Sequence, residues 1–248
     1  MKNLIFNSES SIALGTWLSI GSPVIAELAA ECGLDWVLID LEHGSASEAT
    51  VPNQLRALRG TKTQGIVRVG ALDPALIGRV LDWGANGIML PHVRSAEEAA
   101  ACVAAMRYPP AGTRGVSRTV RAFRYGLEEF PGTSEPVLLA QIEDPTGVEN
   151  AEAIAQVDGV NALFVGPADL RFALAQRSQH NGPSYSQCIA QVVAAARSSG
   201  KAAGILIRDL DTISEHFELG FSVLAAQSDL GILRSQYQGL VSLKESLL

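Results

Sequence analysis

Short apolar runs alternate with amphipathic segments along the chain. The first four apolar runs are 13–17, 36–40, 65–69 and 87–90, and the segments that follow them, 23–32, 47–59, 74–83 and 96–106, have the helical spacing of apolar residues. Continuously apolar runs are typical of strands buried on both faces, as in a parallel sheet. Because parallel neighbours require a crossover, usually a helix, the pattern predicts consecutive strand–helix units in one parallel sheet.

The second half of the chain continues this cycle. Four more apolar runs follow, at 137–142, 162–165, 202–207 and 221–225. Eight cycles, and the absence of a Gly-x-Gly-x-x-Gly motif after any strand, favour a closed (β/α)₈ barrel over an open doubly wound sheet. A length of 248 residues also fits one such domain, which is usually about 250 residues long. We therefore expect a single α/β domain, a TIM barrel, over residues 1–248.

Three further segments stand outside the cycle. Residues 230–248 have an apolar helical stripe and are expected to pack on the barrel or on a neighbouring subunit. The long loops 107–136 and 171–183 are expected on the C-terminal face of the barrel, where barrel enzymes have their active sites.

Two acidic residues follow neighbouring apolar runs. Glu143 comes directly after run 137–142, with Gln141 two positions before it, and Asp169 follows run 162–165. Neighbouring parallel strands end at the same edge of a sheet, and side chains two positions apart share a face, so these side chains are expected to meet. Two carboxylates leave most coordination positions of Mg²⁺ or Mn²⁺ to water and substrate. The sequence therefore predicts a divalent metal site at Glu143 and Asp169.

The second and third strands also carry charged residues at their ends. Asp40 precedes His43 by three residues, so its carboxylate is a candidate to orient the imidazole of His43 as a base or acid near neutral pH. Alternatively, His43 is only hydrogen-bonded within a loop. Arg68 lies in an apolar strand, where an unpaired guanidinium is costly. It is expected to hold an anion or a developing oxyanion, or else to pair with a barrel acid.

Substrate contacts are expected at two more strand ends. Trp17 ends the first strand, where its side chain would form the wall of a substrate pocket or plug the barrel mouth. After the sixth strand, the turn Gly166-Pro167-Ala168-Asp169 can present backbone N–H groups to a substrate carboxylate.

The loop 107–136 is rich in arginine in an otherwise acidic protein, with Arg114, Arg118, Arg121 and Arg124. It is a candidate to close over an anionic substrate, or to form solvated or intersubunit salt bridges. Asp82 lies near a predicted helix end, where physics alone favours a solvated carboxylate.

Composition excludes several other functions. The net charge of −7 and the pI near 5.1 disfavour a nucleic-acid partner. Without a long apolar run or an N-terminal signal pattern, we expect a cytoplasmic protein with no membrane partner. Cysteines without metal spacing are expected to be reduced, buried and non-catalytic: Cys32, Cys102 and Cys188. No lysine ends a strand, which disfavours a Schiff-base aldolase: the chain has only Lys2, Lys62, Lys201 and Lys244.

Together these residues resemble the HpcH/HpaI family of class II, metal-dependent aldolases over nearly the whole chain. The matching motifs are Gly15-Thr16-Trp17, Asp40-Leu41-Glu42-His43, Arg68, Leu81-Asp82-Trp83-Gly84-Ala85, Tyr108-Pro109-Pro110, Arg114-Gly115, Gln141-Ile142-Glu143, Gly159-Val160 and Gly166-Pro167-Ala168-Asp169-Leu170. The resemblance implies that Glu143 and Asp169 bind the divalent ion (Mg²⁺, Mn²⁺ or Co²⁺), that His43 is the base and that Arg68 steadies an enolate. It also implies that Asp82 is the acidic partner of His43, and that the protein is a hexamer, a trimer of dimers that exchange C-terminal helices.

The chain departs from the family pattern at three places. Arg171 stands where a serine is usual, residues 172–180 replace a glycine-containing turn, and His92, whose role the sequence leaves undecided, replaces an apolar residue. All three fall where the aldehyde end of the substrate would bind. We expect Arg171 either to reach the pocket and favour an acidic aldehyde, or to lie on the surface.

The sequence therefore predicts an aldolase that reversibly cleaves a 4-hydroxy-2-oxo acid into pyruvate, or a close 2-oxo acid, and an aldehyde through an enolate. Two alternatives are a lyase for a CoA thioester, similar to the β subunit of citrate lyase, and a non-catalytic barrel that binds a metal or a carboxylate.

Overall fold

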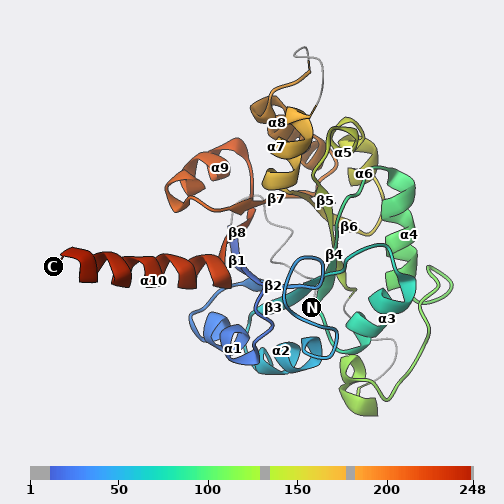
Figure 1. Ribbon diagram of the computed structural model, residues 1–248. Helices are drawn as coiled ribbons and strands as arrows, with labels where there is room; N and C mark the ends of the chain where they lie inside the picture. Colours follow the sequence, from blue (N-terminus) through green and yellow to red (C-terminus); the bar gives the residue numbers. More distant parts are fainter. Residues whose placement is uncertain (1–11, 129–134, 177–181, 247–248) are drawn as a thin grey trace.

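Eight parallel strands form a closed barrel, in which each strand pairs with its neighbours in sequence and β8 pairs with β1 (Figure 1). The structure is a computed structural model and describes residues 12–128, 135–176 and 182–246. The strands are β1 (Ala13–Leu18), β2 (Trp36–Asp40), β3 (Gln64–Arg68), β4 (Gly87–Leu90), β5 (Val137–Ile142), β6 (Val160–Val165), β7 (Ala202–Ile207) and β8 (Val223–Ser228). The predicted (β/α)₈ barrel is confirmed.

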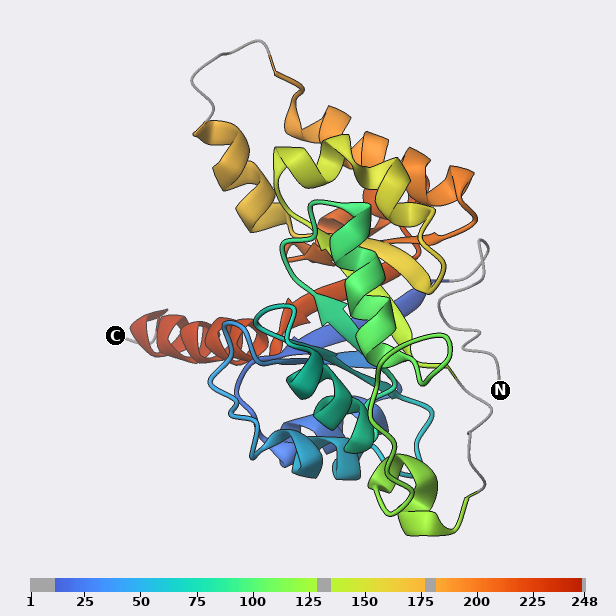
Figure 2. The same ribbon diagram turned by 90° about the vertical axis from the view of Figure 1, so that its right-hand side faces the viewer.

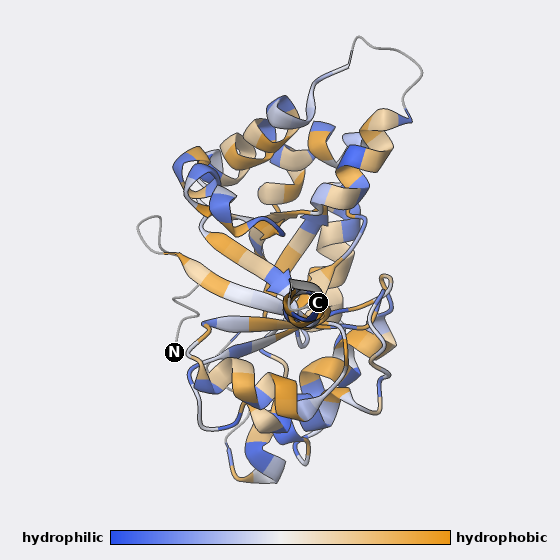
Figure 3. Cartoon of the chain, turned by 60° about the vertical axis from the view of Figure 1, so that its left-hand side comes forward, coloured by the Kyte–Doolittle hydropathy of each residue, from blue (hydrophilic) through white to orange (hydrophobic). Residues whose placement is uncertain are grey.

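Helices surround the barrel and pack buried residues on the outer side of the strands, except α10, which extends away from it (Figure 1). They are α1 (Pro23–Glu31), α2 (Val51–Ala57), α3 (Pro74–Asp82), α4 (Ala96–Met106), α5 (Pro145–Glu149), α6 (Ala151–Ala155), α7 (Pro167–Ala175), α8 (Tyr185–Ser198), α9 (Ile213–Leu219) and α10 (Asp229–Ser246), with 3₁₀ turns η2 (Arg121–Gly126) and η3 (Leu210–Thr212). Hydrophobic and hydrophilic residues alternate along the outer helices, as expected for helices with one buried face (Figure 3).

Large aromatic side chains fill the barrel interior where the facing residues are glycines. Trp36 and Phe164 are fully buried and pack at 6.0 Å between ring centroids. A Cβ at Gly15 would lie 2.5 Å from the Trp36 ring, and one at Gly204 would lie 2.4 Å from the Phe164 ring, so only glycine fits at either position. This apolar layer closes the interior of the barrel beneath the charged side chains at the carboxyl ends of β2, β3 and β5.

Several predicted boundaries are wrong. The fifth crossover contains two short helices, α5 and α6, that meet at Asn150, and β8 begins two residues later than expected. The predicted loop 171–183 begins inside α7, because the helix that starts after Gly166 continues to Ala175; residues 177–181 lie outside the described part of the chain.

The cysteines are free, as expected, but Cys32 is exposed at the end of α1 rather than buried. Burial raises the pKa of the Cys102 thiol to about 12, so this side chain behaves as a small hydrophobic residue.

The described residues 107–128 and 135–136 of the predicted loop 107–136 lie on the opposite face from the one predicted. The loop leads from α4 into β5, and loops that lead from a helix into a strand lie on the N-terminal face of the barrel. The contacts of the loop support this placement. The Arg121 guanidinium donates to the carbonyl oxygen of Trp83 at 2.9 Å, at the carboxyl end of α3, and to that of Leu55 at 2.8 Å, near the carboxyl end of α2. Within one chain, this arginine-rich loop therefore cannot cover the strand ends that carry Glu143 and Arg68.

The C-terminal helix α10 extends away from the barrel (Figure 1 and Figure 2). Its first residue is fixed, because the Asp229 carboxylate accepts the backbone N–H groups of Ser19 and Ile20, both at 3.0 Å. Beyond this anchor it exposes the large apolar side chains Leu230, Ile232, Tyr237, Leu240, Val241 and Leu243. No helix in the described part of the chain has the length and apolar character that a membrane span needs.

Candidate active site at the carboxyl ends of the strands

A buried ion pair joins the ends of β2 and β3. Arg68 Nε donates to Asp40 Oδ1 at 3.0 Å and Nη2 donates to Oδ2 at 2.7 Å, which gives a bidentate pair between side chains that are 7% and 2% exposed. Asp40 also accepts the backbone N–H groups of Glu42 at 3.0 Å and His43 at 3.2 Å. Burial alone would raise the pKa of Asp40, but Arg68 and these backbone donors outweigh it and lower the pKa below its ordinary value.

Trp17 supports this pair from the barrel interior. Its indole Nε1 donates to Asp40 Oδ2 at 3.3 Å, and the Arg68 guanidinium lies 5.0 Å from the centre of its ring. Trp17 is 5% exposed and packs on Phe164 at 5.8 Å between ring centroids. Trp17 therefore lies beneath the charged residues at the mouth of the barrel.

The carboxylate of Glu42 continues the network toward β4. Its Oε2 lies 2.8 Å from Arg68 Nη1, and its Oε1 lies 3.0 Å from Nε2 of His92 and 3.7 Å from Nε2 of His43. Asp40 therefore fixes the backbone of His43, whereas Glu42 is the acid beside its imidazole. The His43 side chain is 67% exposed and faces solvent at the mouth of the barrel.

Glu143 lies at the end of β5 with its two oxygens held from opposite sides. The backbone N–H of His92 donates to Oε1 at 2.7 Å, and the side-chain amide of Gln141 donates to Oε2. A Cβ at Gly166 would lie 2.5 Å from Oε2, so glycine is required for β6 to end this close to the carboxylate. Burial raises the pKa of Glu143, and the negative charges of Asp169 and Glu42 raise it further. His92 opposes this change, because its charge and its backbone N–H both lower the pKa, but the pKa remains above its ordinary value.

Asp169 lies in the first turn of α7, which begins directly after Gly166 at the end of β6. Gly166, directly before α7, lies against the Glu143 carboxylate, and the negative charge of Asp169 contributes to the raised pKa of Glu143. The turn from Gly166 to Asp169 is thus a helix N-terminus. Because the first N–H groups of a helix have no partner within it, those of Ala168 and Asp169 are available to an anion.

The donor set fits a hard divalent cation. Four carboxylates, Asp40, Glu42, Glu143 and Asp169, share this edge with the guanidinium of Arg68, whereas the nearby Arg94 is paired with Asp144, so a surplus of negative charge remains. The side-chain oxygen of Gln141 is buried without a hydrogen-bond partner, so it is one more oxygen ligand or acceptor. No group of three or more potential ligand residues has the geometry of a complete metal cage in the described residues. Two carboxylates with open positions match the way Mg²⁺ is usually bound.

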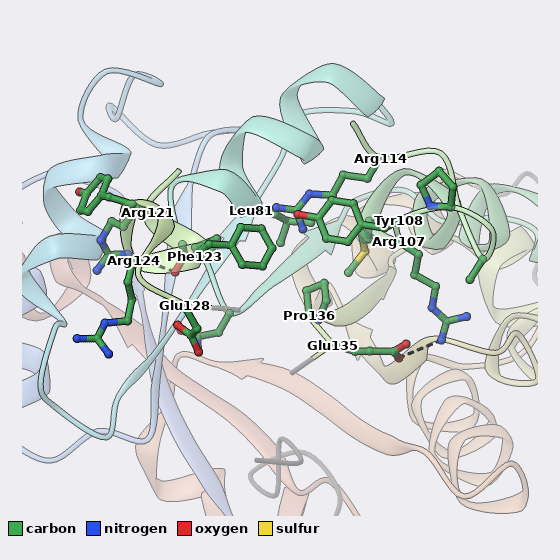
Figure 4. Close-up of a pocket in the computed structure, with 18 of the residues that line it drawn as sticks. Leu81, Arg107, Tyr108, Arg114, Arg121, Phe123, Arg124, Glu128, Glu135 and Pro136 are labelled. Carbon is green, nitrogen blue, oxygen red and sulfur yellow. Dashed lines mark hydrogen bonds and ion pairs between the residues drawn. The ribbon is translucent and has the colours of Figure 1, made fainter. Parts of the chain in front are cut away.

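Asp82 lies away from this cluster. It ends α3 on the N-terminal side of the barrel, where its carboxylate accepts a hydrogen bond from Arg114 Nη2 at 2.6 Å. A cavity of about 1070 Å³ opens beside this pair, lined by the arginine-rich loop, and Figure 4 shows Arg114 beside the ring of Tyr108. Within one chain the structure does not bring Asp82 to His43, and this cavity belongs to the other face of the barrel.

In this structure Arg171 lies on the surface and does not reach the cluster of charged residues. It is exposed on α7, and its guanidinium carbon lies 3.5 Å from the centre of the Tyr185 ring at the start of α8. The Arg171 guanidinium therefore stacks on Tyr185 and makes no contact with the carboxylates around Arg68.

Sequence reasoning missed two members of the cluster, Glu42 and His92. Glu42 belongs to the Asp40-Leu41-Glu42-His43 motif, and its position two residues after Asp40 is a signal that it shares the same edge. For His92 the signal was its position two residues after the end of β4.

Comparison with known proteins agrees with this geometry. The family model described as HpcH/HpaI aldolase/citrate lyase matches residues 13–235. The chain is 37% identical to the 5-keto-4-deoxy-D-glucarate aldolase of Klebsiella pneumoniae subsp. pneumoniae, over 97% of this chain and 98% of that protein.

Two solved structures also match over nearly the whole chain. An HpcH/HpaI aldolase/citrate lyase family protein from Burkholderia cenocepacia J2315 superposes with a TM-score of 0.88 at 34% identity, with 97% of each chain covered. The HpcH/HpaI aldolase from Desulfitobacterium hafniense DCB-2 superposes with a TM-score of 0.84 at 30% identity, covering 95% of this chain and 93% of that chain.

The Asp40–Arg68 pair predicts a stability change with a defined pH dependence. Asp40→Asn leaves a buried guanidinium poorly paired and should lower the free energy of unfolding by roughly 3 kcal/mol at pH 7. Because the pKa of Asp40 is lowered on folding, its stabilisation is present above the unfolded value, near 3.8, and is lost as the pH falls below it. Urea unfolding of both proteins should show a constant difference from pH 7 to about 4.5, narrowing only at lower pH. If the difference in the free energy of unfolding between the two proteins already shrinks between pH 7 and pH 5, the assigned role of Asp40 is wrong.

Proposed function

Because the chain belongs to the HpcH/HpaI aldolase/citrate lyase family and is a carbon–carbon lyase of the aldolase type, we propose that it reversibly cleaves a 4-hydroxy-2-oxo acid into pyruvate, or a close 2-oxo acid, and an aldehyde. The observation that carries the proposal is the cluster of carboxylates beside Arg68 and the N-terminus of α7. It offers a cation site, an anion site and an exposed histidine at one barrel mouth. The aldolase relatives favour this reaction over the cleavage of a CoA thioester.

Glu143 and Asp169 are the residues that would hold a divalent ion. When bound, such an ion polarises the 2-keto group of the substrate and stabilises negative charge on the enolate oxygen. The first N–H groups of α7 bind the substrate carboxylate, and the side-chain amide of Gln141, which donates to Glu143 Oε2, keeps the Glu143 carboxylate oriented. Mg²⁺, Mn²⁺ and Co²⁺ are the ions proposed.

His43 moves the proton. Its exposed imidazole takes the proton from the 4-hydroxyl of the substrate, the C3–C4 bond breaks to release the aldehyde, and the electron pair of that bond forms the enolate. Arg68 lies beside Glu42 and Asp40 with its guanidinium plane fixed, so it presents positive charge to the developing oxyanion without reorganising. Protonation at C3 then gives pyruvate.

The substrate class we propose is a 2-keto-3-deoxy sugar acid, for which 5-keto-4-deoxy-D-glucarate is the first compound to test. The proposal is supported by a relative that is 37% identical and carries that substrate in its name.

The exposed apolar face of α10 supports a homo-oligomer. Leu230, Leu233, Tyr237 and Val241 line a groove on this helix that its own barrel does not cover. We propose that a second copy of the chain packs against it, as in the hexamer implied by the family resemblance. Light scattering during size-exclusion chromatography measures the mass of the assembly directly, and a monomer at micromolar concentration would contradict the proposal.

The reaction should require a divalent ion. Pyruvate release from a panel of 4-hydroxy-2-oxo acids, measured with a coupled lactate dehydrogenase assay, should disappear in excess chelator and return on addition of Mg²⁺, Mn²⁺ or Co²⁺. Glu143→Gln, which keeps the shape but removes the charge, should remain inactive after the ion is restored. Full turnover in excess chelator would refute the metal site, and unchanged substrates throughout the panel would favour a non-catalytic barrel.

Arg68→Lys separates charge from geometry. Lysine keeps a positive charge beside Asp40 and Glu42, but it lacks the planar fork that both carboxylates now hold. We expect kcat to fall by about 10²–10³, typical of a lost oxyanion donor, with little change in divalent ion affinity. The two readouts are steady-state kinetics and calorimetric titration with Mn²⁺. Wild-type kcat in this variant would remove Arg68 from the oxyanion role.

A further inference from the structure

His92 has a backbone conformation that is uncommon for residues other than glycine. It follows Pro91 beyond β4 with φ of 55°, in the left-handed region. Residues with a Cβ adopt this region at a cost, so it persists where surrounding contacts impose it. The contacts of His92 identify that constraint.

One residue supplies two groups to the same carboxylate oxygen. The backbone N–H of His92 donates to Glu143 Oε1 at 2.7 Å, and its ring Nδ1 lies 2.8 Å from the same atom. The other ring nitrogen, Nε2, lies 3.0 Å from Glu42 Oε1. The ring therefore lies between two carboxylates from different strand ends, and its side chain is still 50% exposed at the barrel mouth.

His92 completes a continuous network across four neighbouring strands. Asp40 and Glu42, after β2, hold Arg68 of β3; Glu42 contacts His92 after β4; and His92 contacts Glu143 after β5. His92 thus links the half of the cluster that contains Arg68 to the half that contains Glu143. Because His92 contacts only Oε1, the other carboxylate oxygen of Glu143, Oε2, faces Gly166, the residue directly before α7.

We propose that His92 is a positioning residue that holds Glu143 in the orientation needed to bind a divalent cation. The inference rests on the proposed function, because Glu143 is there assigned to the ion. With Oε1 fixed by His92 and Oε2 held by Gln141 against Gly166, the carboxylate is kept at the end of β5, next to the start of α7. Partners that orient a ligand in this way typically change metal affinity by about 10–100-fold when removed.

The test is the affinity of the protein for Mn²⁺ alone, measured by calorimetric titration without substrate. His92→Gly removes the ring, keeps the backbone N–H and tolerates positive φ. His92→Asn also tolerates this conformation, and its side-chain amide keeps one donor close to the backbone, but it is too short to reach Glu42. His216→Ala is the matched control, because His216 lies on the outer helix α9, with ring Nδ1 2.7 Å from the Thr212 carbonyl oxygen.

We expect Mn²⁺ binding to weaken by about 10–100-fold in His92→Gly, by less in His92→Asn, and not at all in His216→Ala. The thermal unfolding midpoint of the metal-free His92→Gly protein should stay close to that of the wild type, which separates positioning from a structural role. If His92→Gly does not fold, His92→Asn decides by the same comparison with the wild type.

Each outcome has one meaning. Wild-type affinity in the His92 variants would overturn the inference and leave the proposed function intact. A wild-type protein that binds no Mn²⁺ would overturn the proposed function and the inference with it. Weakened binding that follows the order given above would support both.

Discussion

The bidentate pair between Asp40 and Arg68 is the interaction on which the candidate site depends. It places a guanidinium, 6% exposed, at the top of an apolar barrel interior, where an unpaired charge would be costly. The second contact of Arg68, to Glu42, and the link from Glu42 to His92 extend this one pair to Glu143. The charges do not cancel within the network, because carboxylates outnumber the guanidinium. A site with this surplus gains stability from a bound cation, which is the physical reason for connecting it to divalent metal chemistry.

The fold supplies the rigidity that this charge cluster needs. Trp36 and Phe164 pack against glycines in the barrel interior, and Trp17 closes the layer directly below Asp40 and Arg68. The charged side chains therefore stand on an incompressible apolar layer at the ends of strands, where their positions vary little. The first turn of α7 adds backbone N–H groups at the same edge. Binding an oxo acid here then requires little movement of the protein before the chemistry.

The fold and the main residues of the site could be read from the sequence, because both are encoded locally. Apolar runs of strand length predict the barrel, and the acids at or shortly after the ends of two of them are the basis for predicting a metal site at Glu143 and Asp169. Contacts between side chains that are far apart in sequence could not be read in this way. The sequence made Asp40 the partner of the His43 imidazole, whereas Asp40 pairs with Arg68, and the role of His92 depends on a positive φ with no local signal. The loop 107–136 was misplaced for a different reason: its arginines suggested a substrate, although its position between α4 and β5 puts it on the other face.

The central claim is that this strand edge forms an enolate from a 2-oxo acid, and it can be tested without knowing the aldehyde. The measurement is the exchange of the methyl protons of pyruvate for deuterium, followed by proton NMR in D₂O with Mn²⁺ removed before detection or with Mg²⁺ throughout. The account predicts metal-dependent exchange with the wild-type protein and none above background with Glu143→Gln or His43→Gln, because enolate formation needs both the ion and the base. Exchange that continues in excess chelator, or that survives in both variants, would contradict it.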